Sequence, residues 1–210
     1  MTVTTDSAAE HAGGGFNMPE ATAKGGPDYG RFLAAVRTVQ DHARAADAPD
    51  HVITAAADLL QQVSGLLEPY YADEWASPSG RRYDLPNRGN ILAVPAELTK
   101  TDSDTVSGWV RFDRYHLGRN GAAHGGALGL LFDSVLGYTA AVLSGEFTQR
   151  TAYLHIDYRA IVPVQRQLDV VARLRSQQGR KIIVDATLFD GEKVLTEASA
   201  LFLKLKPGQP

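Results

Sequence analysis

The segment NGAAHGGALGLLFDSVLGYTAAV, residues 120–142, is apolar on nearly every side and long enough to form a helix of several turns. It opens with His124-Gly125-Gly126, and Asp133 is its only Asp, Glu, Lys or Arg. A helix that is apolar all round has to be covered on most of its sides by other elements. This segment therefore predicts a long central helix with one carboxylate near its middle.

The segments next to this helix have the pattern of strands. Before it, DTVSGWVRFDRYH (residues 104–116) alternates and is rich in residues that favour strands. After it, RTAYLHIDYRAIV (residues 150–162) alternates strictly, and the following residues share one side: Ala152, Leu154, Ile156 and Tyr158. One strand is therefore expected on each side of the helix.

Three more strands are predicted within residues 167–206. Gln178-Gly179 and Asp190-Gly191 separate them, and Asp-Gly is a strong signal for a two-residue hairpin turn. The order is thus strand, helix and four strands in succession. This order predicts an α+β fold in which a curved antiparallel sheet wraps around the long helix.

The N-terminal part of the chain has a different composition. Residues 1–28 contain few large apolar groups and are predicted to be a disordered arm. Residues 31–46 and 51–67 each place apolar side chains at helical spacing, so two amphipathic helices are expected there. The predicted organisation is an arm (1–28), a two-helix extension with a linker (29–80) and a main domain (81–206).

Composition excludes several classes of function. The chain has 21 Lys and Arg against 24 Asp and Glu, and no basic run that could follow a nucleic-acid backbone. It has no cysteine, which excludes disulfides, thiolate metal sites and a cysteine nucleophile. The first residues do not resemble a secretory signal, and no window was expected to be apolar enough for a membrane span. The sequence therefore predicts a cytoplasmic protein that binds no nucleic acid.

His124-Gly125-Gly126 stands where the central helix begins. A helix start exposes unpaired N–H groups and the positive end of the helix dipole. Two glycines allow another group to approach this backbone closely. The segment thus suits an oxyanion or a polarised carbonyl. The alternative is that both glycines only permit tight packing of helix on sheet, and that His124 is a capping or core side chain.

Asp133 is the second unusual feature of this helix. A lone carboxylate among apolar residues is costly unless it is hydrogen-bonded or functional. The structural alternative is a solvent-exposed seam of small residues through Gly129, Asp133 and Gly137, which recur at every fourth position. The same seam would let a ligand or a partner backbone come close to the helix. Asp133 is therefore a candidate catalytic residue.

The spacing of these two features has a consequence for assembly. Eight residues of helix place Asp133 about 12 Å from Gly125. An oxyanion donor and an activating base must both lie within about 3 Å of the reacting group. Two antiparallel copies of the helix can meet this requirement, because Gly125 of one then faces Asp133 of the other. A homodimer with two equivalent interface sites is therefore expected.

The segment HGGALGLLFDSVLG followed by TAYLHIDYRAIVP resembles the hotdog-fold acyl-CoA thioesterases. It is closest to the phenylacetic-acid-pathway-type branch, in which an acid lies on the central helix nine positions after the histidine. The resemblance extends over about residues 81–206. The two preceding helices resemble those of extended members of the superfamily.

The resemblance implies roles for individual residues. Asp133 would attack the thioester or activate water, the Gly125 N–H would polarise the carbonyl, His124 would hold the loop or the thioester, and Thr151 would place a hydroxyl near the attacking water. For the substrate it implies contacts to Asn120, Gly126 and Arg159. It implies acyl-CoA as the substrate, with no cofactor and no metal. Whether the expected homodimer pairs further into a homotetramer stays open.

Other interpretations remain open at this stage. A hotdog enoyl-CoA hydratase or dehydratase would use a histidine before the helix, here His116, although HLGR departs from the pattern of that group. A non-catalytic acyl-CoA-binding or regulatory protein would use the two N-terminal helices as a docking element. The acyl group is either fatty or aromatic, with three residues proposed to line an apolar tunnel: Leu128, Leu136 and Tyr138.

Overall fold

A computed structural model describes residues 20–73, 76–206 and 209. The helices are α1 (Tyr29–Ala45), α2 (Asp50–Leu67) and α3 (Gly125–Ser144), with short 3₁₀ turns η1 (Glu68–Tyr70), η2 (Pro86–Gly89) and η3 (Arg114–His116). The strands are β1 (Ala96–Lys100), β2 (Thr105–Phe112), β3 (Gln149–Tyr158), β4 (Arg166–Gln178), β5 (Lys181–Asp190) and β6 (Lys193–Lys204).

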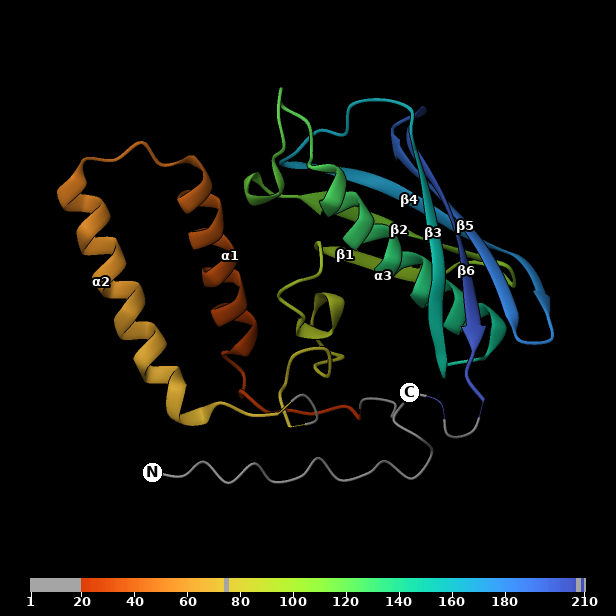
Figure 1. The fold of residues 1–210 in the computed structure, drawn as a ribbon, viewed down its shortest axis with the longest axis horizontal. Coiled ribbons are helices and arrows are strands. Elements are labelled where there is room, and N and C mark those ends of the chain that lie inside the picture. Colours follow the sequence, from red (N-terminus) through yellow and green to blue (C-terminus); the bar gives the residue numbers. More distant parts are fainter. Residues whose placement is uncertain (1–19, 74–75, 207–208, 210) are drawn as a thin grey trace.

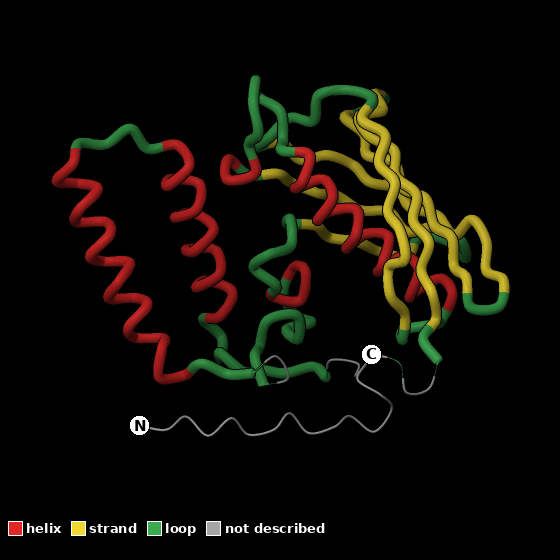
Figure 2. The backbone as a smooth tube through the Cα atoms, in the orientation of Figure 1, coloured by secondary structure: helices red, strands yellow, loops and turns green. Residues whose placement is uncertain are grey.

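The six strands form one antiparallel sheet in the order β1-β2-β4-β5-β6-β3. Helix α3 lies along one face of this curved sheet (Figures 1 and 2). The core between helix and sheet includes Leu131, Phe132 and Leu136 of α3 against Phe112 and Leu188 of the sheet, all at most 1% exposed. The predicted α+β hotdog architecture is therefore confirmed.

The hairpin turns agree with the sequence pattern, but one strand was missed. Gly179 and Gly191 both have φ of +58°, a backbone conformation that glycine adopts without steric cost. Strand β1 pairs with β2 at the edge of the sheet. Its sequence AELTK buries Ala96 alone among its five residues, so it carries too weak an apolar pattern to be recognised.

Helix α3 corrects one expectation. By length and composition it is apolar enough to cross a membrane, so the expectation that no segment reaches this length was wrong. In the fold this apolar character faces the sheet, and eight side chains of α3 are buried there: Ala127, Leu128, Leu131, Phe132, Val135, Leu136, Thr139 and Ala140. The apolar length is thus what a central core helix requires.

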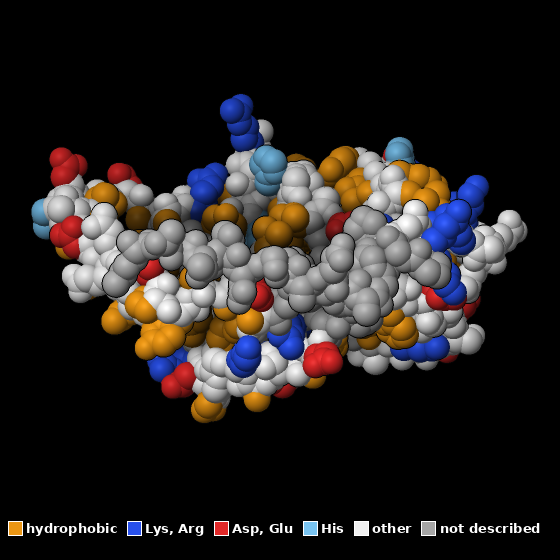
Figure 3. Space-filling view, turned by 60° about the horizontal axis from the view of Figure 1, so that its bottom comes forward, with side chains coloured by type: hydrophobic (Ala, Val, Ile, Leu, Met, Phe, Trp, Pro, Cys, Tyr) orange, Lys and Arg blue, Asp and Glu red, His pale blue; other side chains and the backbone are white. Residues whose placement is uncertain are grey.

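The two predicted N-terminal helices form a hairpin beside the sheet, with α1 next to the main body and α2 beyond it (Figure 1). Helix α1 contacts η3. Every residue of α2 is exposed within the described chain, including Leu59 and Leu66. Hydrophobic side chains are accordingly visible on the surface at this end of the molecule (Figure 3).

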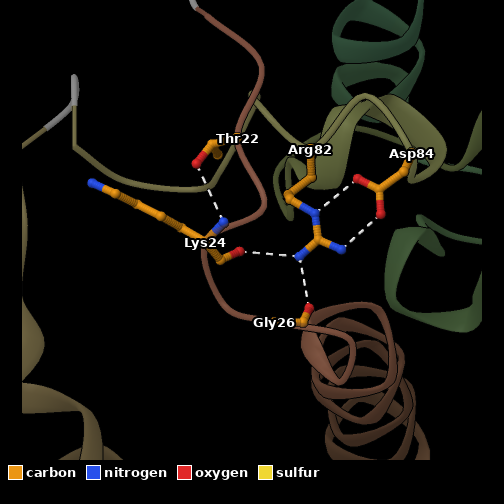
Figure 4. A network of polar contacts seen from close by, with 5 residues as sticks. All are labelled: Thr22, Lys24, Gly26, Arg82 and Asp84. Carbon is orange, nitrogen blue, oxygen red and sulfur yellow. Dashed lines mark hydrogen bonds and ion pairs between the residues drawn. The ribbon is translucent and has the colours of Figure 1, made fainter.

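The base of the hairpin is held by Arg82, whose side chain is only 6% exposed. It forms a two-pronged ion pair with Asp84, at 2.8 and 2.7 Å, and donates to the carbonyls of Lys24 and Gly26, at 3.0 and 2.9 Å (Figure 4). Residues 20–28, the described end of the predicted arm, are thus attached to the linker. Residues 1–19 lie outside the described residues.

Candidate active site

The start of α3 is organised by His124. Its Nδ1 accepts the N–H of Gly126 at 2.9 Å, and its carbonyl accepts the N–H of Ala127 at 2.9 Å. The N–H of Gly125 has no acceptor within the described part of the chain. His124 therefore occupies the amide of Gly126 and leaves that of Gly125 available to a ligand oxygen.

Gly125 borders an open, mostly apolar hollow of about 280 Å³. The other lining residues are Ala122, Ala123, Leu128, Tyr158, Arg159, Ala160, Ile161 and Val162. The Tyr158 hydroxyl donates to the Gly125 carbonyl at 3.3 Å, and a Cβ added to Gly125 would lie 3.3 Å from that hydroxyl. Glycine thus lets the tyrosine approach the helix start.

Tyr158 was not among the sequence candidates. It belongs to the side of β3 that carries Leu154 and Ile156, which is the side expected to be apolar. The sequence offered one indication of a role for Tyr158, namely a hydroxyl-bearing side chain on the side of the strand that is otherwise apolar. Its contact with Gly125 depends on where β3 crosses α3, which no local pattern encodes.

Asp133 and Thr151 are brought together as the resemblance implied. The Thr151 hydroxyl donates to Asp133 Oδ1 at 2.9 Å, and both side chains are exposed. Asp133 is therefore solvent-accessible in the single chain and lies on a solvent-exposed face of α3. The hydroxyl fixes one carboxylate oxygen and leaves the other open to water or substrate.

A β-bulge makes this contact. In the pairing with β6, Thr151 is opposite Phe202 and Tyr153 is opposite Leu201, so Ala152 is an extra residue. Strict alternation would have placed Thr151 on the outer side with Tyr153. The extra residue turns Thr151 to the inner side instead, where Phe202 is buried. The expected strict alternation at Ala152 was wrong, and the exception serves the site.

The predicted seam of small residues is open over only part of its length. A Cβ on Gly129 would meet no atom within 4 Å in the described structure, whereas one on Gly137 would lie 3.6 Å from the Phe202 ring. Leu130 and Tyr138 of α3 are each 40% exposed, so the solvent-facing part of the helix carries apolar side chains as well as Asp133.

The predicted substrate-binding residues are at the edge of this region. Arg159 lines the hollow but pairs with Glu197 at 2.7 Å and with Asp157 at 3.3 Å. The hydrogen bond to Glu197 and the nearby charges raise the pKa of Arg159 above its usual value. Asn120 has φ of +54° in the turn before α3, a conformation that Asn tolerates well. Its clearest role is to shape that turn.

His116, the residue on which the hydratase interpretation rested, is buried at 8% exposure. Its Nδ1 accepts the N–H of Asp113 at 3.0 Å, completing a capping box around η3. Burial, partly offset by Asp113, lowers the pKa of His116 below its usual value. Because its ring is buried and hydrogen-bonded in this cap, His116 has a structural role and is not available as the catalytic histidine that the hydratase interpretation requires.

The described residues form no cluster of metal ligands, and the two parts of the candidate catalytic site lie apart. Among residues 20–73, 76–206 and 209, no group of three or more His, Asp or Glu side chains is placed to hold a metal ion. The free Gly125 amide and the Asp133 carboxylate are about 12 Å apart along one helix. A single chain therefore presents two half-sites, a polarising amide and a carboxylate, on different parts of α3.

Comparisons with known proteins agree on one family. Residues 120–197 match the sequence profile of the Thioesterase superfamily. The chain is 37% identical over 92 residues to the mouse acyl-coenzyme A thioesterase THEM4, covering 43% of this chain and 39% of that protein. It is 35% identical over 95 residues to PA0474 of Pseudomonas aeruginosa, an esterase by name, covering 44% of this chain and 70% of that protein.

The alignment spans about two fifths of the length of the THEM4 relative. Among solved structures, the thioesterase superfamily protein RHA08564 is similar over 89% of this chain and 97% of its own, with 26% identity and a TM-score of 0.69. This similarity includes more of the chain than the family profile does. The chain belongs to the thioesterase superfamily.

Proposed function

We propose that this protein hydrolyses the thioester of an acyl-CoA to a free acid and coenzyme A. In one route Asp133 takes a proton from water as the water attacks the thioester carbonyl, the C–S bond breaks, and the proton passes to the leaving thiolate. In the other route Asp133 attacks the carbonyl, the thiolate leaves, and water then hydrolyses the resulting anhydride to free acid and Asp133. In both routes the Gly125 N–H stabilises the developing oxyanion. Two features of α3 carry this proposal. Asp133 accepts a hydrogen bond from Thr151 of β3, and the N–H of Gly125 on the same helix is unpaired within the described chain.

The substrate assignment rests on chemistry. A thioester carbonyl is activated compared with an amide, so one polarising amide and one carboxylate suffice. The hollow at Gly125 is lined mostly by apolar side chains, including Leu128 and Ile161, and its charged lining residue Arg159 is already paired with two carboxylates, which favours a fatty or aromatic group over a charged one. Leu136, proposed to line the tunnel, is fully buried in the core, so the hollow takes the place of that tunnel.

A homodimer completes the site in this proposal. Strand β3 ends the described sheet, so its outer edge is available for another strand. On the helix side of the sheet, Leu130 and Tyr138 of α3 are each 40% exposed, so α3 presents apolar surface that a second copy can cover. A twofold axis here would set two α3 helices antiparallel, with Gly125 of each near Asp133 of the other.

The first test is thiol release from short, long and aromatic acyl-CoAs by the wild type and Asp133→Asn. Release by the wild type that collapses in the variant supports the proposal, and the panel ranks the substrates. Binding of acyl-CoA without release by the wild type would instead support the non-catalytic interpretation. Addition of water to an enoyl-CoA would point to a hydratase.

Mixed dimers test whether the site is shared. Asp133→Asn chains and Gly125→Val chains are each expected to be inactive alone. Their heterodimer contains one site with both wild-type residues, so an equal mixture should recover about a quarter of wild-type activity. An active monomer in sedimentation, or no recovery in proven heterodimers, would reject the shared site.

A further inference from the structure

Helix α1 reaches the segment that leads into the active site. Asp41 Oδ1 accepts the N–H of Tyr115, in η3, at 2.8 Å. One turn further along α1, Arg44 Nη2 donates to the carbonyl of Gly118 at 3.4 Å. Each contact joins residues 74 apart in the sequence, and both are made to the segment that runs from η3 to the start of α3.

The segment that Asp41 holds determines where α3 begins. The carbonyl of His116, next to Tyr115, accepts the N–H of His124 at 2.7 Å. The intervening residues fold back on themselves, because Gly118 N–H donates to the carbonyl of Ala122 at 2.8 Å. His124 is therefore placed by η3, and it in turn caps the helix and leaves the neighbouring Gly125 amide free.

Asp41 is not needed to keep α1 in place. Arg37 Nη2 donates to the carbonyls of Asn90 and Ala93, at 3.1 and 2.9 Å, and Arg82 holds the base of the hairpin. These contacts anchor α1 to the linker. The Asp41 carboxylate is directed at one backbone N–H of η3, so its removal releases that segment while α1 stays attached.

We propose that Asp41 is a positioning residue for the oxyanion-binding end of the site. Through Tyr115 and His116 it holds His124, and thereby aims the Gly125 N–H. The extension is on this basis a brace for catalysis. This inference rests on the proposed thioesterase function, since it concerns the same amide.

The kinetic test compares Asp41→Ala with Asp41→Asn, which keeps an acceptor oxygen. Asp41→Ala should lower kcat about tenfold with KM changed less than about twofold, because a displaced amide weakens transition-state stabilisation more than binding. Asp41→Asn should stay within about threefold of wild type. Equal kcat in Asp41→Ala and wild type, or no rescue by Asn, would overturn the proposal.

Asp28→Ala is the matched control at the N-cap of the same helix, where the Asp28 side chain caps no N–H. Asp28 pairs with Arg31 at 3.0 Å, with both side chains more than 70% exposed, and it touches no part of the site segment. Exposed pairs of this kind contribute little, so this variant should match wild type in kcat and KM. A loss of kcat equal to that of Asp41→Ala would show that any damage to α1 suffices, and would reject a specific role for Asp41.

Amide hydrogen exchange separates this proposal from the proposed function. In Asp41→Ala, peptides within residues 113–127 should exchange at least about tenfold faster, while those of β4 and β5 stay unchanged. Unchanged exchange at 113–127, or an equal increase everywhere, would reject the positioning role. If the wild type releases no thiol, the thioesterase proposal fails, and the exchange result still decides whether Asp41 holds the segment.

Discussion

The two half-sites on α3 are held in different ways. At its start, the backbone of His124 is fixed by His116, its side chain caps Gly126, and Tyr158 covers the Gly125 carbonyl. At its middle, the Asp133 side chain has a single hydrogen bond within the described chain, from the Thr151 hydroxyl. The amide end is thus fixed by many modest contacts, whereas the carboxylate end depends on one residue for its chemistry.

This difference predicts how mutations should act. Removing one contact at the start of α3 should shift a donor slightly and cost a modest factor in rate. Changing the carboxylate should remove the chemical step with little effect on the fold, because Asp133 is exposed. The following predictions test the contrast in order of expected size.

Asp133→Asn is expected to have the largest effect. The amide keeps the shape and the contact with Thr151 but cannot act as a base or nucleophile, so kcat should fall about 1,000-fold. The melting temperature should change by less than about 2 °C. Steady-state kinetics and thermal unfolding check this, and a variant with more than a tenth of wild-type kcat would remove Asp133 from the mechanism.

Gly125→Ala should have the next largest effect. Its new Cβ lies 3.3 Å from the Tyr158 hydroxyl, so the side chain must shift beside the free amide, and kcat should fall about tenfold. Gly65→Ala in α2 is the control, since its Cβ meets nothing within 4 Å in the described chain. It should retain activity and gain about 0.5–1 kcal/mol of stability.

Gly129→Ala sharpens the proposed assembly, because Gly129 lies midway between Gly125 and Asp133 on the helix. A Cβ there meets no atom within 4 Å in the described chain, so an effect of this variant reports the partner helix. Sedimentation should show a weakened dimer, and an unchanged dimer would place the twofold axis elsewhere. Equal activity losses in Gly125→Ala and Gly65→Ala would contradict the assignment of Gly125 as the oxyanion donor.

Thr151→Val should reduce kcat about fivefold. The substitution keeps the volume and removes the hydroxyl, and one exposed hydrogen bond to a carboxylate contributes about 1 kcal/mol. Thr151→Ser, which keeps the donor, should remain close to wild type. Loss of activity in both variants would indicate that packing at the bulge, and not the hydroxyl, supports Asp133.

His116 should produce the smallest effect, seen as a pH dependence of stability. Its folded-state pKa is lowered because burial disfavours the charged ring, while Asp113 and Asp41 oppose and Arg37 adds to the shift. The unfolded chain therefore binds a proton first as pH falls below about 6.5, and stability decreases until the folded pKa is reached.

The comparison for this prediction is His116→Asn, whose amide oxygen can replace Nδ1 as the acceptor. The difference in unfolding free energy between wild type and variant should be constant above about pH 7 and should shift against the wild type as pH falls toward 5. Denaturant unfolding at several pH values measures it. A constant difference throughout would show that His116 is not the group that titrates.

Much of the site could be predicted because its main features are local. His124, Gly125 and Asp133 follow one another on one helix, so spacing alone relates them. The contact of Asp133 with Thr151 was implied by family resemblance, while the strand periodicity pointed the other way. The extra residue at Ala152 is a property of pairing with β6, which the alternation of β3 does not reveal.

The missed features share a dependence on contacts between distant segments. His116 precedes the helix in sequence like a catalytic histidine, but the cap at Asp113 buries it. Tyr158 and Asp41 reach the start of α3 from β3 and from α1. Neither contact can be predicted from periodicity, because periodicity indicates only which side of its own helix or strand a residue occupies.

The sequence by itself determined the helices α1, α2 and α3 and the strands β2 to β6, in their order. Apolar periodicity specified α1 and α2, a run that is apolar on nearly every side specified α3, and glycine placed the turns at Gly179 and Gly191, because these are local preferences of the chain. Only the tertiary structure decided that α1 braces the site segment while α2, with the same kind of pattern, buries none of its residues within the described chain. An amphipathic pattern states that a helix has an apolar side, and its partner follows from the packing of the whole molecule.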